Sequence, residues 1–299
     1  MEKDLLYSRL VVFGCSFTDF LQWPTWADWM AKHYRYYVKL ATGGTGNRAI
    51  FHTLVNYLNE NPNLTDTHIV IQWSGCPRED KMLSSDSINK KVVKNYSSCG
   101  NIFNTYCYPK EYASNYFSIY QSLYETVNYI AVAKELLKNR KIEYTMTFML
   151  NPKVQGFFGE PGFNVHNEVV PSRQLKEYTQ LFSKVDSLVD KRFTAKCMTF
   201  HQLDTPVTVY TEMNEMGEVQ KDGHPSPFQH YSFFTKYIAP KFGIDTIEDS
   251  TATLKLVEKW EKYAKIKEYW ENKKHLEPKA WPAVYRYLGH KIIKEYKLI

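Results

Sequence analysis

Two short segments, more than 200 residues apart, hold side chains that together could carry out nucleophilic chemistry. Ser16 comes two residues after Gly14, where the apolar run 10–13 ends, so its hydroxyl is expected on a turn. Asp222 and His224 share one short Asp-Gly-His-Pro loop. A serine hydroxyl becomes a nucleophile when an imidazole takes its proton and a carboxylate orients that imidazole. The three residues are therefore candidates for nucleophile, base and orienting acid; a plain turn serine and a structural histidine are the alternative interpretations.

A glycine cluster lies between these two segments in the sequence. Residues 41–47 read Ala-Thr-Gly-Gly-Thr-Gly-Asn and precede a predicted helix. Backbone amides before a helix N-terminus can stabilise an oxyanion or hold a phosphate. No Lys-Ser/Thr follows the cluster and the G-x-G-x-x-G spacing is absent, so neither common nucleotide-binding loop is predicted. A plain turn is the alternative.

Alternating strand and helix patterns are expected to position these motifs. Short apolar runs predict strands at residues 10–13, 68–73 and 144–150. Helical patterns cover residues 25–34, 46–60, 115–140, 172–190 and 226–240. This alternation predicts a three-layer α/β/α domain with a central parallel sheet over residues 1–243. Ligands bind beyond the carboxyl ends of such strands, which is where Ser16 and Ser74 would lie.

Two segments interrupt the alternation, and the C-terminal part has a different pattern. Residues 76–114 and 151–171 are insertions that could form lids, substrate walls or surface decoration. Residues 244–299 form a basic tail, predicted to be helical from two apolar series at helical spacing. The first series is Leu256, Trp260, Tyr263 and Ile266, and the second is Trp281, Tyr285, Leu288, Ile292 and Tyr296. The tail is either a helical hairpin packed on the main domain or a docking element for a protein partner.

Charge and composition limit the function classes. Residues 250–299 contain 12 Lys/Arg and 6 Asp/Glu, leaving 26 of each kind in the rest of the chain. Lysines alternate with glutamates in the tail, which disfavours nucleic-acid binding. No apolar run is long enough for a membrane span. The five cysteines form no CxxC pair and the nine histidines no HExxH motif, so neither a metal nor any other cofactor is expected. The N-terminus lacks a signal-peptide pattern, and we expect synthesis in the cytoplasm.

The order of these motifs resembles the SGNH (GDSL-type) hydrolases. The forms Gly-Cys-Ser-Phe-Thr at residues 14–18 and Asp-Gly-His-Pro-Ser at residues 222–226 are most similar to bacteriophage-encoded members. The resemblance implies a flavodoxin-like domain that hydrolyses esters, including lipids, thioesters or O-acetylated sugars. It assigns Ser16 as nucleophile, His224 as base and Asp222 as acidic partner. It also implies that the backbone amides of Gly44 and Ser16 form the oxyanion hole, and that the protein acts on a small ester or acylated glycan.

Three positions depart from the family pattern. Cys15 replaces the usual Asp before the serine, and Asp222 precedes the histidine by two residues where three is usual. Ser74 stands nearest the position of an Asn that completes the oxyanion hole, and Asn47 could substitute for that Asn. Losing one oxyanion donor costs about 100–1,000-fold in turnover. We therefore expect a slowed esterase; a structural or binding protein on this scaffold, such as a phage-particle component, is the alternative.

Overall fold

The computed structural model describes residues 7–20, 23–76, 78–82, 96–101, 111, 115–149, 225–246 and 250–272. It divides into two compact units, which we describe one at a time. The sheet unit comprises Met1–Asp19 and Ala31–His201, and the helical unit comprises Phe20–Met30 and Gln202–Ile299. Asp222, His224, the predicted helix 172–190, the insertion 151–171 and the second tail series lie outside the described residues. The predicted domain boundary at residue 243 stays a prediction.

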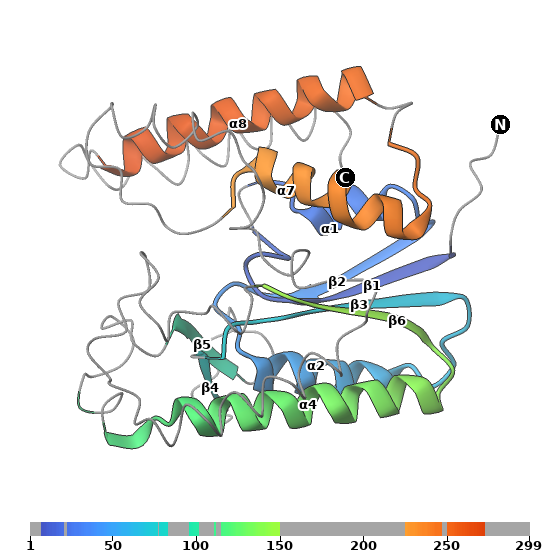
Figure 1. Cartoon of the computed structure of the whole chain (residues 1–299), viewed down its shortest axis with the longest axis vertical. Coiled ribbons are helices and arrows are strands. Elements are labelled where there is room, and N and C mark those ends of the chain that lie inside the picture. Colours follow the sequence, from blue (N-terminus) through green and yellow to red (C-terminus); the bar gives the residue numbers. More distant parts are fainter. Residues whose placement is uncertain are drawn as a thin grey trace. The chain divides into compact units, whose positions relative to one another are not determined.

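A four-stranded parallel sheet forms the centre of the sheet unit (Figure 1). Its order is β2–β1–β3–β6, with β1 Arg9–Gly14, β2 Tyr36–Ala41, β3 Thr67–Trp73 and β6 Glu143–Phe148. This is the beginning of the flavodoxin-like order, in which the direction of winding reverses between the first and third strands. The predicted α/β class and its parallel sheet are thus confirmed. The strand β2 was not predicted, because this edge strand is only partly buried and shows no continuous apolar run.

Two helices cover one face of this sheet (Figure 1). They are α2, Asn47–Glu60, and α4, Ile119–Asn139, and they agree with the predicted helices 46–60 and 115–140. Alternate residues of the strands point to this face and form its core with the apolar sides of both helices. That core includes Val11, Phe13, Ile71, Trp73, Leu54, Leu58, Ile130 and Leu137.

Some of the intervening residues of the strands carry buried polar groups, among them His68, Gln72 and Thr145. His68 on β3 bonds through Nδ1 to the Tyr34 hydroxyl at 2.9 Å and through Nε2 to Thr145 Oγ1 at 3.0 Å. Burial raises the pKa of Tyr34 well above its ordinary value, with the neighbouring Tyr7 adding to the effect. This chain of contacts lies near the amino ends of the strands. It is therefore a structural feature of the edge opposite Ser16.

The insertion 76–114 contains a small antiparallel sheet of its own. Its strands are β4, Arg78–Met82, and β5, Tyr96–Asn101. The side chain of Asp80 on β4 is 2% exposed and contacts the beginning of α2. Part of the insertion is thus integrated into the sheet unit, which the weakly periodic sequence did not indicate.

The helical unit is built around aromatic contacts. It contains α1, Trp26–Ala31; α7, Pro227–Phe233, continued by η4, Phe234–Ile238, and η5, Ala239–Phe242; and α8, Ser250–Asn272. The Trp26 ring meets Phe233 edge-on, with centroids 6.1 Å apart. Glu261 on α8 accepts a hydrogen bond from the Phe228 amide of α7 at 3.1 Å. The predicted helices 25–34 and 226–240 are confirmed, although α1 ends at Ala31.

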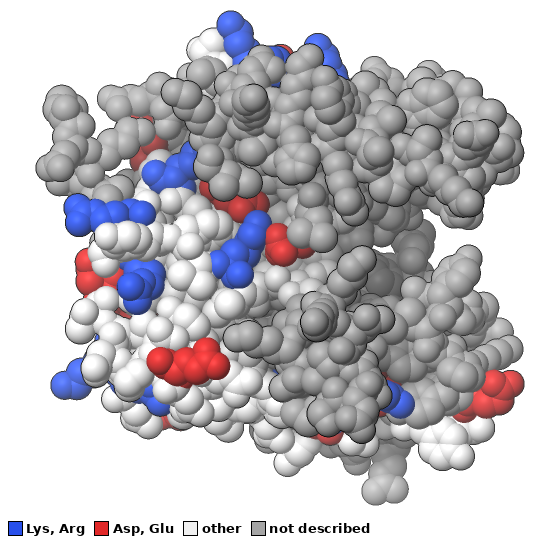
Figure 2. Space-filling view, turned by 180° about the vertical axis from the view of Figure 1, so that it is seen from behind, with Lys and Arg blue, Asp and Glu red and all other residues white. Residues whose placement is uncertain are grey.

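The first tail helix is also present as α8. Leu256 and Trp260, from the predicted apolar series, are 3% and 1% exposed. None of the described helices has the length and apolarity needed to cross a bilayer. Figure 2 shows Lys and Arg side chains interspersed with Asp and Glu over the described surface of one face.

Candidate active site

Ser16 lies on a tight turn at the carboxyl end of β1. The carbonyl oxygen of Cys15 accepts hydrogen bonds from the amides of Thr18 and Asp19, both at 2.9 Å, which closes the turn around Ser16. The serine is 6% exposed. This is the position that a parallel sheet reserves for ligand-binding groups. The structure therefore places Ser16 where the sequence predicted it.

A buried side-chain hydrogen bond ties this turn to the neighbouring strand. Thr18 Oγ1 donates to Gln72 Oε1 on β3 at 2.6 Å, and both residues are fully buried. Gly14 makes this approach possible, because a Cβ at that position would lie 2.8 Å from Thr18 Cβ. The position of Ser16 is thus fixed by β3 as well as by β1.

The glycine cluster forms a second turn against Ser16. Thr45 donates its amide to the Thr42 carbonyl at 3.3 Å, and Gly44 between them has a φ of +79°. Positive φ at the third position of a turn favours glycine. A Cβ on Gly43 would lie 3.8 Å from Ser16 Cβ, so these two residues are neighbours.

Three backbone amides at this edge, those of Ser16, Gly43 and Gly44, donate no hydrogen bond within the described part of the chain. Open amides beside a nucleophile are the groups that stabilise a tetrahedral oxyanion. The oxyanion roles that the resemblance implies for Gly44 and Ser16 stay predictions. The proximity of Gly43 to Ser16 could not be read from the sequence.

Asn47 and Ser74 lie side by side, but of their two side chains only that of Asn47 forms hydrogen bonds among the described residues. Asn47 Oδ1 accepts from the Ser74 amide at 2.7 Å, while Nδ2 donates to the Ser74 carbonyl at 3.1 Å and to Thr126 Oγ1 at 3.0 Å. Both amide hydrogens of Asn47 are engaged by these contacts. Ser74 Oγ is buried and finds no partner within the described part of the chain. Asn47 clamps α2 to the end of β3, and the oxyanion roles of both residues stay predictions.

Cys15, the first departure from the family pattern, has an apolar environment. Its side chain is fully buried, and its thiol contacts Met149 Sδ at 3.2 Å. A carboxylate in this place would be desolvated against a thioether, which is costly without a partner. The cysteine therefore suits the packing at this position.

The other two predicted triad members, Asp222 and His224, lie outside the described residues. The residue that follows His224 is described: Pro225 is buried, and its carbonyl oxygen accepts a hydrogen bond from Trp23 Nε1 at 3.1 Å. Ser226 then begins α7 with a capping box that pairs it with Gln229 in both directions. The chain immediately after His224 is thus held by two specific contacts within the helical unit.

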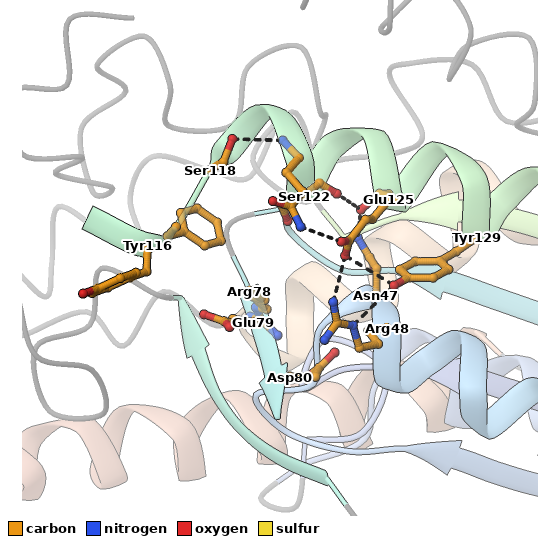
Figure 3. Close-up of a pocket in the computed structure, with 13 residues that line it drawn as sticks. Asn47, Arg48, Arg78, Glu79, Asp80, Tyr116, Ser118, Ser122, Glu125 and Tyr129 are labelled. Atoms are coloured by element: carbon orange, nitrogen blue, oxygen red, sulfur yellow. Dashed lines mark hydrogen bonds and ion pairs between the residues drawn. The ribbon is translucent and has the colours of Figure 1, made fainter. Parts of the chain in front are cut away.

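A polar hollow of about 80 Å³ lies between α2, β4 and α4 (Figure 3). Arg48 and Glu125 point toward each other in it, at 3.1 Å, and the Tyr129 hydroxyl contacts both at 3.4 Å. Burial opposes the charged form of Glu125, but hydrogen bonds from Gln121 and Arg48 outweigh it and lower the pKa of the carboxyl. Arg48 and Glu125 are thus paired with each other in this hollow.

Comparisons with known proteins give weak likenesses. No protein-family model matches the sequence, and no curated protein does. A lipolytic protein of the G-D-S-L family from Veillonella parvula is 10% identical, with a TM-score of 0.35 over 76% of this chain and 94% of that one. A GDSL-like lipase from Bacteroides thetaiotaomicron is 16% identical, with a TM-score of 0.38 over 79% of this chain and 88% of that one.

A third solved structure, a putative acylhydrolase from Bacteroides fragilis, is 14% identical. Its TM-score is 0.36, over 79% of this chain and 86% of that one. Likenesses of this strength do not establish a family. The fold class rests on the parallel strand order of the protein itself.

Proposed function

We propose that this protein is a serine esterase in which Ser16 is the nucleophile, His224 the general base and Asp222 the residue that orients the imidazole. One observation carries the proposal. Ser16 lies on a fixed turn beyond β1, and Gly43 of the second turn lies against it with open backbone amides nearby. A nucleophile beside preorganised oxyanion donors is the arrangement that acyl transfer requires.

The proposed reaction has two halves. Ser16 Oγ attacks the ester carbonyl carbon while His224 takes the hydroxyl proton, and the carbonyl oxygen becomes an oxyanion facing the open amides. The tetrahedral intermediate then expels the alkoxide, which receives that proton and leaves as an alcohol. Water, deprotonated by His224, attacks the acyl-serine and releases the acid. Ser16 then regains its proton from His224.

The substrate that we propose is a small ester, such as an O-acetylated carbohydrate. The hollow beside the beginning of α2 is lined largely by polar side chains and carries the exposed ring of Tyr116 at its edge. Polar groups with an aromatic ring suit a hydroxyl-rich leaving group better than a long acyl chain.

A second candidate is a binding or structural protein on this scaffold, for example a phage-particle component. The specific observation in its favour is that Asn47, the substitute for the family's oxyanion Asn, has both amide hydrogens engaged elsewhere. Such a protein would bind an acylated ligand or a partner without turning it over.

Hydrolysis of p-nitrophenyl acetate by the purified protein tests the esterase proposal. The Ser16→Ala variant should lose at least about 1,000-fold in kcat, because no other group replaces the nucleophile. The matched control is Ser8→Ala, which makes the same change at the amino end of the same strand and should keep wild-type turnover. Equal rates for the wild-type protein and Ser16→Ala would contradict the proposal and favour the binding protein.

A further inference from the structure

We propose that Asp80 is a positioning residue of the active site: its carboxylate holds the glycine turn that lies against Ser16. This inference rests on the proposed function, because it gives Asp80 an indirect part in the same oxyanion hole. Asp80 comes from β4, in an insertion that the sequence alone left as lid, wall or decoration. Its carboxylate is buried and contacts the beginning of α2 (Figure 3).

The Asp80 carboxylate fills the anion-binding end of α2. Oδ1 accepts from the Gly46 amide and Oδ2 from the Ala49 amide, both at 2.8 Å. The helix has no capping side chain of its own, since its N-cap residue is Gly46. A carboxylate at this end satisfies two otherwise unpaired amides and interacts favourably with the helix dipole. The site that could have held a phosphate is therefore occupied by the protein itself.

A second contact from β4 holds the residue between the cap and the turn. Arg78 Nη1 donates to the Thr45 carbonyl at 3.1 Å. Gly46 fits tightly beneath both residues: a Cβ there would lie 2.7 Å from Asp80 Oδ2 and 2.9 Å from the Arg78 carbonyl oxygen. Contacts from β4 thus fix the positions of residues 45 and 46.

Two backbone hydrogen bonds connect residues 45 and 46 to the turn that lies against Ser16. Thr45 closes the turn by donating to Thr42, and Thr42 donates its own amide to the Gly14 carbonyl at 3.2 Å. The two residues between them are glycines, which have more backbone freedom than other residue types and therefore need restraint from their neighbours. Because Gly43 and Gly44 are held at both ends, their amides can point steadily at the reacting carbonyl. Preorganised donors of this kind act mainly in the transition state.

The Asp80→Asn variant tests this inference. It keeps the size of the side chain but turns one acceptor oxygen into an amide group that faces the Ala49 or Gly46 amide. We expect kcat on p-nitrophenyl acetate to fall about 10- to 100-fold, less than for complete loss of a donor, with KM changed less than about 2-fold. Backbone amides of residues 42–49 should exchange with solvent deuterium faster than in the wild type.

The matched control is Asp66→Asn, which makes the same change in a carboxylate that accepts a hydrogen bond from the Ser8 amide at 3.0 Å, near the amino ends of the strands. It should keep kcat and leave exchange at residues 42–49 unchanged. Unchanged kcat and unchanged exchange at residues 42–49 in Asp80→Asn would overturn the inference. So would an equal kcat loss in both variants, since that would reflect general destabilisation.

The two proposals fail separately. If the wild-type protein shows no Ser16-dependent turnover, the proposed function is wrong, and the exchange measurement still decides whether Asp80 fixes the glycine turn. If wild-type turnover depends on Ser16 but Asp80→Asn keeps its kcat, the esterase stands and the role of Asp80 falls.

Discussion

The chemistry of Ser16 depends on contacts that its immediate sequence does not contain. Thr18, two residues later, bonds to Gln72 on β3, and Gly43 on another turn lies against Ser16. Each contact removes freedom from a short polar loop that would otherwise adopt several conformations. A serine on a loop becomes a reliable nucleophile only when such restraints are in place.

The Thr18→Val variant measures the restraint at this scale. Valine matches threonine in shape but removes the buried hydrogen bond to Gln72 Oε1, so unfolding should require about 1–3 kcal/mol less. Urea denaturation followed by circular dichroism gives the value. Thr53→Val on α2, where the half-buried threonine hydroxyl donates to the Ala49 carbonyl of its own helix, should cost about 0.5 kcal/mol or less. Equal losses in the two variants would contradict a special role for Thr18.

A site residue could be predicted from the sequence only where the pattern that marks it lies within a few neighbouring residues. Gly14 and Ser16 lie within one turn, so their spacing alone indicated a serine just beyond the end of β1, although not that this serine is only 6% exposed. Thr18 and Asp80 act on residues 54 and 34 positions away in the sequence. No local pattern marks such pairs, because an isolated threonine or aspartate is common on any loop. They could be found only once the strands were assembled.

Among the elements, the helix α4 packs against the sheet through one apolar side. Ile130 is fully buried in the core that α4 shares with the sheet, whereas Val132 on the same helix is 47% exposed. Helix spacing separates these two residues by about half a turn, so they lie on different sides. The sequence predicted this helix well, because its apolar residues recur at helical spacing.

Truncating Ile130 to alanine tests the packing of α4. We expect a loss of about 2–5 kcal/mol in the free energy of unfolding, since the cavity cannot close fully between a helix and a rigid sheet. Val132→Ala is the control on the same helix and should change stability by about 0.5 kcal/mol or less. Urea midpoints of the two variants give the comparison. A loss below about 1 kcal/mol for Ile130→Ala would contradict the described core.

The strand β2 and the β4–β5 pair could not be predicted from sequence patterns. The run Tyr36–Ala41 contains Lys39, whose ammonium pairs with Asp19 at 2.9 Å, and it forms an edge strand without an apolar signature. The β4–β5 pair is rich in charged and small polar residues, and its pairing is specified by tertiary contacts. Edge and insertion strands bury too little of their length for periodicity to reveal them.

At the scale of the whole molecule, the helical unit has contacts and a core of its own. The helical unit holds the residue after His224 through Trp23 and uses one side of α8 as part of its core. That side of the tail is therefore occupied within the chain, and a partner would have to use its other residues.

Labelling with a fluorophosphonate, followed by peptide mass spectrometry, tests the central claim most directly, because the reagent reacts only with a serine activated by a base. We predict one adduct, on Ser16, that is absent from Ser16→Ala, strongly slowed in His224→Ala and unchanged in Ser8→Ala. A wild-type protein that forms no adduct, or that forms the same adduct after Ser16→Ala, would contradict that claim.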